Sequence, residues 1–190
     1  MMPLVLVYAG GRKYQFVAVD VLRSSYFGGP LSAKVTGIPH GPRMLHQIAF
    51  VSAADIPILR EHFVSLPLLY GMQFDGCSLT YRLTTALEEI EVTKLEPTTS
   101  SDSWPYPNYP AHLPYYQLAI AEATDCSWKD FSDSLPNAPS TQRGTVYAVV
   151  PPPMTIGFSL WGRDGDDEGV HLAWEFDAKS RVVTAYNLCT

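Results

Sequence analysis

Residues 4–21 read LVLVYAGGRKYQFVAVDV, and this stretch decides the fold that we expect. Two runs rich in β-branched and aromatic residues flank Gly10-Gly11, a pair that is typical of a tight hairpin turn. In the second run, Phe16 and Val17 belong to opposite faces, and both faces are apolar along the run. A strand with two apolar faces is typical of the middle of a sheet. We therefore expect a hairpin whose second strand lies inside a larger sheet.

Further runs rich in Val, Ile, Tyr, Phe and Trp alternate with Gly, Pro or Asp turns, which is typical of strands. They cover residues 46–51, 69–74, 78–83, 90–95, 116–121, 145–150, 156–161, 170–176 and 181–188. Helical periodicity occurs twice, over residues 55–66 and 127–135. We expect Asp55 to cap the first helix, and Ser127 with Asp130 to form a capping box at the second.

This distribution of elements predicts the α+β class: a largely antiparallel sheet, two short helices and long loops rich in proline and aromatic residues. The chain of 190 residues is 46% apolar and 17% charged, which excludes a disordered protein. Its length fits one domain, and we expect residues 1–190 to form a single one.

The formal net charge is −6, and it is spread unevenly. Residues 1–95 carry 8 basic and 7 acidic side chains, whereas residues 96–190 carry 5 and 12. An acidic half repels phosphate, so we expect no binding to nucleic acid or to anionic membranes. A basic protein partner would be attracted. The simpler alternative is that the charge only keeps the protein soluble.

The three cysteines are Cys77, Cys126 and Cys189, which do not follow the spacing of a disulfide framework or a zinc site. The apolar run at the N-terminus lacks a preceding basic region and is shorter than the roughly 20 residues that span a bilayer. These features predict a cytoplasmic protein without a metal or cofactor.

Residues 104–116 read WPYPNYPAHLPYY, the most unusual segment of the chain. Proline fixes φ and restricts the preceding residue, so the segment is held extended and loses little entropy on binding. Its aromatic residues would then be anchors in a protein interface. Two alternatives remain: a Pro-x-x-Pro ligand at Pro107 and Pro110, or rings that pack on the sheet. The candidate partner-binding residues here are Trp104, Tyr106, Tyr109, His112 and Tyr115.

A second candidate surface is acidic and comprises Asp164, Asp166, Asp167 and Glu168. With Gly169 and Glu175 these residues match the spacing of a calcium loop. However, the flanking residues alternate like strands, whereas a calcium loop of this type lies between helices. We therefore interpret the segment as an acidic turn that contributes to partner binding, without a metal.

Catalysis is the competing hypothesis, because Cys77 follows Gly76 and five histidines could act as its base. No family signature surrounds Cys77, and a turn explains Asp75-Gly76 equally well. Glu89 and Glu91 are explained as a charged strand face.

We therefore expect a non-enzymatic protein-interaction module, such as an inhibitor or an immunity-type protein that engages a basic partner. The alternatives are a small hydrolase or transferase that uses Cys77 with a histidine, and a small-ligand binder with an aromatic pocket.

Overall fold

A computed structural model describes residues 2–37, 45–72, 76–84, 88–97, 111–152 and 170–188. The helices are Pro57–Glu61 (α1) and Trp128–Asp133 (α2). The strands are Val5–Ala9 (β1), Arg12–Val19 (β2), Ser25–Gly29 (β3), Lys34–Thr36 (β4), His46–Val51 (β5), Leu66–Tyr70 (β6), Cys77–Leu83 (β7), Glu89–Pro97 (β8), Leu113–Asp125 (β9), Val146–Val150 (β10), His171–Asp177 (β11) and Val182–Leu188 (β12).

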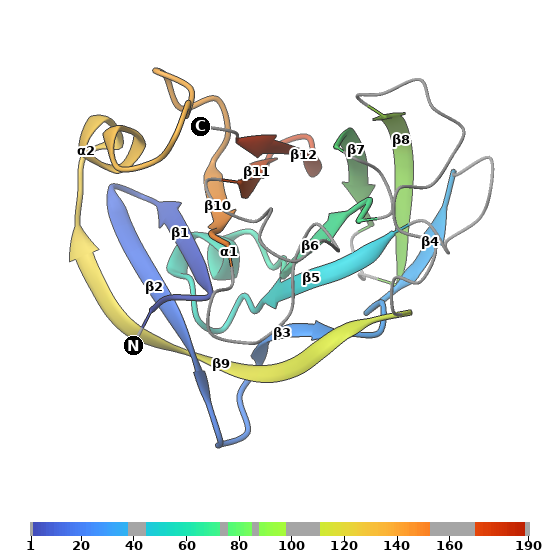
Figure 1. The fold of residues 1–190 in the computed structure, drawn as a ribbon, viewed down its shortest axis with the longest axis horizontal. Coiled ribbons are helices and arrows are strands. Elements are labelled where there is room, and N and C mark those ends of the chain that lie inside the picture. Colours follow the sequence, from blue (N-terminus) through green and yellow to red (C-terminus); the bar gives the residue numbers. More distant parts are fainter. Residues whose placement is uncertain are drawn as a thin grey trace.

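All these strands belong to one sheet, in the order β4-β8-β7-β12-β11-β10-β1-β2-β9-β3-β5-β6 (Figure 1). The pairings are antiparallel except for the parallel pair β4 and β8. The expected mostly antiparallel sheet with two short helices is therefore confirmed. The helices have five and six residues, so the label α+β describes the fold less well than a curled β-sheet does. No helix in the described ranges has the length and apolarity needed to cross a membrane.

The hairpin expected at the N-terminus is confirmed. β1 and β2 are antiparallel, with Ala9 opposite Arg12 across the turn. Gly10 and Gly11 adopt φ angles of 58° and 74°, a left-handed conformation that glycine reaches without steric cost. β2 pairs with β1 on one side and with β9 on the other, as its two apolar faces predict.

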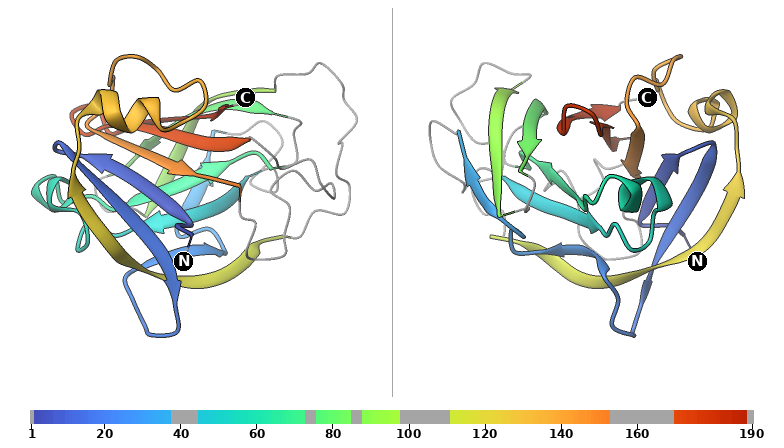
Figure 2. Two further views of the ribbon diagram at one scale, coloured as in Figure 1. Left: turned by 60° about the vertical axis from the view of Figure 1, so that its left-hand side comes forward. Right: turned by 180° about the vertical axis from the view of Figure 1, so that it is seen from behind.

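The sheet curls so that the edge strand β6 lies inside it, next to β12 (Figure 2). Every residue of β6 is buried. Along the free edge of β6, main-chain groups form hydrogen bonds with side chains from facing strands instead of with a neighbouring strand. The Tyr81 hydroxyl donates to the Pro67 carbonyl at 2.6 Å and accepts from the Leu69 N–H at 3.2 Å. The Trp174 indole N–H donates to the Leu69 carbonyl at 2.8 Å. Proline at position 67 has no N–H to satisfy.

The curled sheet has an apolar cluster on each face. The concave face holds the main core, in which Phe16, Phe27, Tyr81 and Trp174 are fully buried. On the opposite face, α2 covers a smaller cluster. This second cluster comprises Tyr8, Phe131, Leu135, Tyr147, Val149, Ala173 and Leu188, with Trp128 packed against it.

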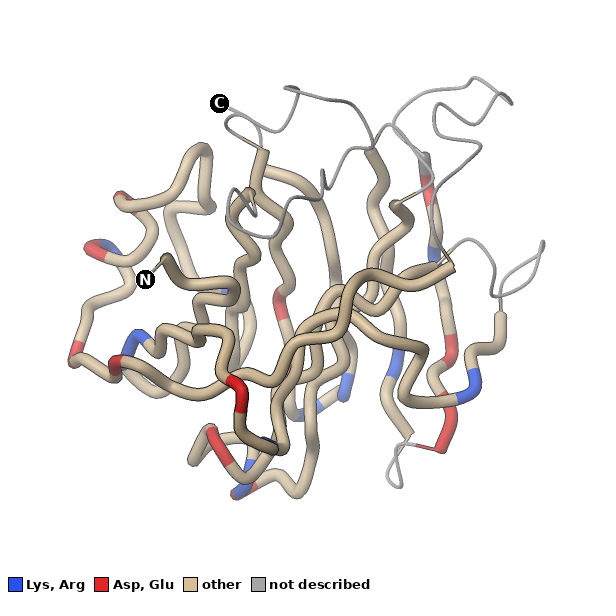
Figure 3. The backbone as a smooth tube through the Cα atoms, turned by 60° about the horizontal axis from the view of Figure 1, so that its bottom comes forward, with Lys and Arg blue, Asp and Glu red and all other residues tan. Residues whose placement is uncertain are grey.

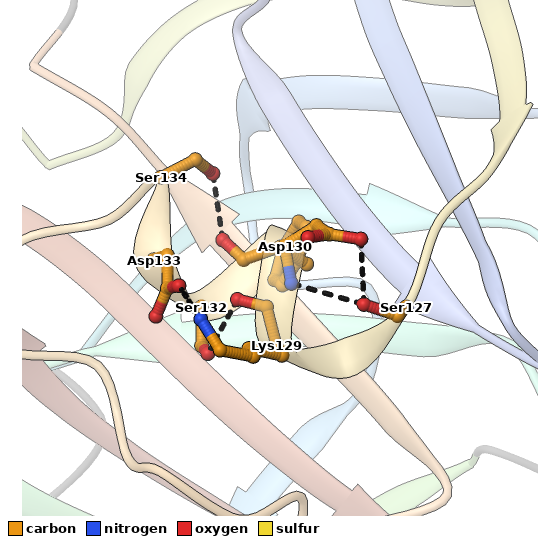
Figure 4. A network of polar contacts seen from close by, with 7 residues as sticks. Ser127, Lys129, Asp130, Ser132, Asp133 and Ser134 are labelled. Carbon is orange, nitrogen blue, oxygen red and sulfur yellow. Dashed lines mark hydrogen bonds and ion pairs between the residues drawn. The ribbon is translucent and has the colours of Figure 1, made fainter.

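Helix α2 begins where the sequence predicts (Figure 4). The Ser127 hydroxyl accepts a hydrogen bond from the Asp130 N–H at 3.1 Å and donates to the Asp130 carboxylate at 2.7 Å. Lys129 pairs with Asp133 one turn later, and the Ser134 hydroxyl donates to the Phe131 carbonyl at the other end. The capping box is therefore confirmed in its first half, while the aspartate carboxylate bonds to the serine hydroxyl rather than to a main-chain N–H.

The expected helix over residues 55–66 is wrong in extent. Helix α1 covers only Pro57–Glu61, and Leu66 begins strand β6. Asp55 does not cap the helix, because its carboxylate accepts a hydrogen bond from the Ser25 hydroxyl at 2.5 Å. The apolar residues of this stretch belong first to a helix and then to a buried strand. Together, their spacing resembles that of a single longer helix.

Most other expected strands are confirmed with shifted ends, and the expected strand over residues 46–51 matches β5. The strand expected over residues 69–74 instead covers Leu66–Tyr70. The short strands β3 and β4 were not expected from the sequence. The strand expected over residues 156–161 lies outside the described residues.

Candidate functional site

The structure describes two of the aromatic-segment candidates. His112 is exposed just before β9, and Tyr115 in β9 is 52% exposed. Trp104, Tyr106 and Tyr109 lie outside the described residues. So do Asp164, Asp166, Asp167 and Glu168 of the acidic segment, so its role stays a prediction.

Tyr115 belongs to a row of three rings on the outer face of β9, β3 and β5. Its ring centroid lies 5.2 Å from that of Tyr26, and Tyr26 stacks on Phe50 at 5.1 Å with an interplanar angle of 10°. Tyr26 and Phe50 are direct partners across β3 and β5. Neighbouring residues of β9 such as Leu118 point the other way, into the core. Tyr115 is the most exposed member of this aromatic row.

Gln117 joins Tyr115 to the loop between β2 and β3. Its amide N–H donates to the Tyr115 hydroxyl at 2.5 Å, and its amide oxygen accepts from the Arg23 main-chain N–H at 2.6 Å. Since β9 lies between β2 and β3 in the sheet, residues 20–24 must cross β9 to connect them. The contact with Gln117 places this crossing loop on the outer face, where it projects from the body (Figures 1 and 2). The sequence analysis does not predict this loop, because it does not predict strand β3, into which the loop leads.

The strands that flank the two candidate segments end on the same side of the sheet. His171, at the start of β11, is opposite Leu188, and Cys77 is opposite Pro97 at the end of β8. Because β12 and β7 are antiparallel neighbours, both pairs lie at one end of the sheet. Three interstrand steps separate β11 from β8, or roughly 14 Å at about 4.8 Å a step. The start of β11 and the end of β8 are therefore close together at one end of the sheet.

The described carboxylates of the acidic half all have partners within the chain. Arg12 pairs with Asp125 at 3.1 Å, and Lys94 with Glu96 at 2.8 Å. The others accept hydrogen bonds or pair with lysine: Glu122 with Gln15, Asp130 with Ser127, Asp133 with Lys129, Glu175 with Tyr186, and Asp177 with Ser180. Acidic and basic positions are interspersed over the described backbone (Figure 3). Among the described residues of the acidic half, no carboxylate is without a partner, and a concentrated acidic surface is expected instead from the segment at residues 164–168.

Glu175, the last position of the calcium-like pattern, lies in strand β11 and not in a helix. Its carboxylate accepts a hydrogen bond from the Tyr186 hydroxyl at 2.8 Å, and Tyr186 lies 3.1 Å from the Tyr147 hydroxyl. Burial raises the pKa of Tyr147 to about 12 and raises the pKa of Tyr186 as well. Both tyrosines stay protonated at neutral pH, so they cannot act there as bases. Within the described ranges, no cluster of three His, Cys, Asp or Glu residues could hold a metal ion.

Cys77, the candidate nucleophile, is 1% exposed. Burial raises its pKa to about 11, although its contacts with the Gly71 carbonyl and the Tyr70 hydroxyl act in the opposite direction. A nucleophilic cysteine needs a lowered pKa and access to substrate. Neither condition is met at Cys77, which packs in the main core.

One polar cluster was not expected from the sequence. The Ser25 hydroxyl donates to Asp55 at 2.5 Å and accepts from the Ser52 N–H at 2.9 Å. Ser25 is fully buried, so its hydroxyl ties β3 to the residues that follow β5 and is not accessible to a substrate. A serine within a strand carries no sequence signal for such a contact.

Comparison with known proteins supplies no family for this chain: no family model, no curated protein and no solved structure matches it.

Proposed function

We propose that this protein acts by binding another protein, and that Tyr115 belongs to the contact surface. The observation that supports the proposal is the 52% exposure of Tyr115 at the end of an aromatic row. Most large aromatic residues of a folded protein bury their rings, and exposed tyrosines are enriched in the residues that dominate interface energetics.

Four groups that could act as nucleophiles or bases, two of them buried hydroxyl or thiol groups and two of them tyrosines, do not support catalysis. The Cys77 thiol and the Ser25 hydroxyl are buried, and the tyrosines with shifted pKa values stay protonated. A basic partner would fit the acidic segment at residues 164–168, which adjoins the start of β11. Binding of a small ligand remains an alternative prediction, which a ligand-dependent rise in Tm would support.

The test is affinity capture of partner from native lysate by the immobilised protein at low and at high salt. Tyr115→Ala, and separately Trp104→Ala with Tyr106→Ala, are expected to weaken capture about tenfold or more, as loss of an interface anchor does. High salt is expected to weaken the capture of partner by the wild-type protein. Phe63→Ala is the matched control, because Phe63 is an exposed ring on another connection, between α1 and β6.

Capture that is unchanged in both Tyr115→Ala and the double variant would exclude the aromatic surface. Capture that is equal at the two salt concentrations would exclude an electrostatically attracted partner.

A further inference from the structure

The crossing loop, residues 20–24, is exposed at every position. Val21 is 54% exposed and Leu22 is 88% exposed. Burying a leucine side chain fully is worth about 1.5–3 kcal/mol, so a projecting loop that exposes two adjacent aliphatic side chains forgoes a large stabilisation. The loop is nevertheless held in place by the bond from the Arg23 N–H to Gln117. An ordered, projecting apolar tip is typical of an element that inserts into another surface.

The charges on either side of the tip indicate what kind of surface it would contact. Asp20 precedes the apolar pair and Arg23 follows it. Both side chains are exposed, and neither makes an ion pair or a side-chain hydrogen bond within the described part of the chain. The loop thus presents one negative and one positive charge around an apolar centre, with no net charge.

A two-fold axis through the tip makes this arrangement its own complement. Rotation places Asp20 of one copy opposite Arg23 of the other and Leu22 of one copy opposite Val21 of the other, as an isologous interface requires. A basic partner fits less well, because it would meet Arg23. We propose that residues 20–24 form the centre of a symmetric homodimer interface between two copies of this chain.

The size of the loop sets the expected strength of the dimer. Stable interfaces bury about 800 Å² on each partner, more than five residues supply, so the contact belongs to the weak class. We expect a Kd of about 10–100 µM, within the range of transient complexes. The loop adjoins Tyr115 through Gln117, but the proposal goes beyond the proposed function, because self-association of the purified protein is measured without any other partner.

The first test is sedimentation equilibrium of the purified protein over a wide concentration series. The wild type is expected to shift from 21.0 kDa towards twice that mass as concentration rises. Leu22→Asp should raise the Kd about 100-fold or more, since it brings two unpaired carboxylates to the centre of the interface. Phe63→Asp is the control, because it places the same charge at a site of 85% exposure elsewhere and should leave the Kd unchanged.

The second test uses charge reversal. Asp20→Arg and Arg23→Asp should each weaken self-association about tenfold, because each pairs like charges across the axis. An equimolar mixture of the two variants restores both opposite-charge pairs and should associate within about threefold of the wild type. Circular dichroism of each variant checks that the fold is retained.

A wild type that remains at 21.0 kDa throughout the series would overturn the proposal, even if the loop captured a different protein. Equal association of Leu22→Asp and wild type would also overturn it, as would a mixture that associates no better than its components.

Discussion

At the scale of single residues, Phe63 occupies a backbone position that favours glycine. It follows the last turn of α1 with a φ of 50°, the left-handed region in which glycine predominates. Its N–H bonds to the Arg60 carbonyl at 3.0 Å, and the Val64 N–H bonds to the Leu59 carbonyl at 3.1 Å. These two bonds form a Schellman motif with phenylalanine at the position that glycine usually occupies.

Phe63→Gly is therefore expected to raise the free energy of unfolding by about 0.5–1 kcal/mol, because relief of the left-handed strain exceeds the added entropy of the unfolded chain. The ring is 85% exposed, so little packing is lost. Urea unfolding measures the change. Phe63→Ala is the control: it removes the ring but keeps Cβ, and it should leave stability nearly unchanged. A gain of the same size in both variants would show that the ring, and not the backbone, is the source of the strain.

Cys77 makes stability depend on pH. Its pKa is about 11 in the folded protein, against an ordinary value of 9.0. Between these two pH values the unfolded chain loses the thiol proton while the folded chain keeps it, so the free energy of unfolding falls as pH rises. At 1.36 kcal/mol for each pKa unit, the loss reaches about 2 kcal/mol by pH 11 and levels off above that pH.

Urea unfolding at a series of pH values from neutral upwards measures this loss. In Cys77→Ala the fall between pH 9 and 11 should be shallower. The contribution of Tyr147 should persist in that variant between pH 10 and about 12. Identical slopes in the variant and the wild type would mean that the Cys77 thiol ionises normally in the folded state.

At the scale of elements, strand β6 depends on the side chains that face it. An edge strand that is buried must satisfy its free main-chain groups without a neighbouring strand. The Tyr81 hydroxyl serves the Pro67 carbonyl and the Leu69 N–H together. Burial raises the pKa of Tyr81, so the hydroxyl keeps the proton that it donates to Pro67.

We expect Tyr81→Phe to lower the free energy of unfolding by about 2–4 kcal/mol, because it leaves two buried main-chain groups without partners. Amide hydrogen exchange at Leu69 should also become faster. Tyr147→Phe is the matched control. Among the described residues, the hydroxyl of Tyr147 contacts that of Tyr186, which keeps its bond to Glu175, so the cost should be about 1 kcal/mol. Equal costs in the two variants would contradict the role of Tyr81 at the strand edge.

At the scale of the whole molecule, strands from the two halves of the chain are intermixed in the sheet. β9 lies between β2 and β3, and β10, β11 and β12 lie between β1 and β7. Neither half can complete its hydrogen bonding alone. Urea unfolding is expected to show one transition that coincides for tryptophan fluorescence and far-ultraviolet circular dichroism, as a single cooperative domain requires. Two separated transitions would contradict the expectation that residues 1–190 form one domain.

A feature of the fold can be predicted from the sequence when the residues that cause it lie close together in the chain. The first hairpin follows from Gly10-Gly11 and the alternating runs around it, and the cap of α2 follows from Ser127. Residues 55–66 were misassigned because their apolar spacing suits both a helix and a buried strand. β3 contains two adjacent glycines at positive φ, a composition that does not favour a strand.

The candidate site was predictable to a smaller extent. The proline-rich context makes Tyr115 a candidate and leaves open whether its ring is exposed or packs on the sheet. Its row with Tyr26 and Phe50 is not predicted. Those rings come from strands that are distant in the sequence, and only strand pairing places them side by side. The loop that exposes Leu22 depends likewise on the insertion of β9 between β2 and β3.

The amino-acid sequence by itself determined the β-rich character, the hairpin turn and the cap of α2, because each depends on residues within a few positions of one another. Only the tertiary structure decided which strands are neighbours, how β6 is satisfied by Tyr81 and Trp174, and which apolar side chains are left at the surface. Those features depend on contacts between residues far apart in the chain, and the energy of such contacts is not encoded in any local pattern.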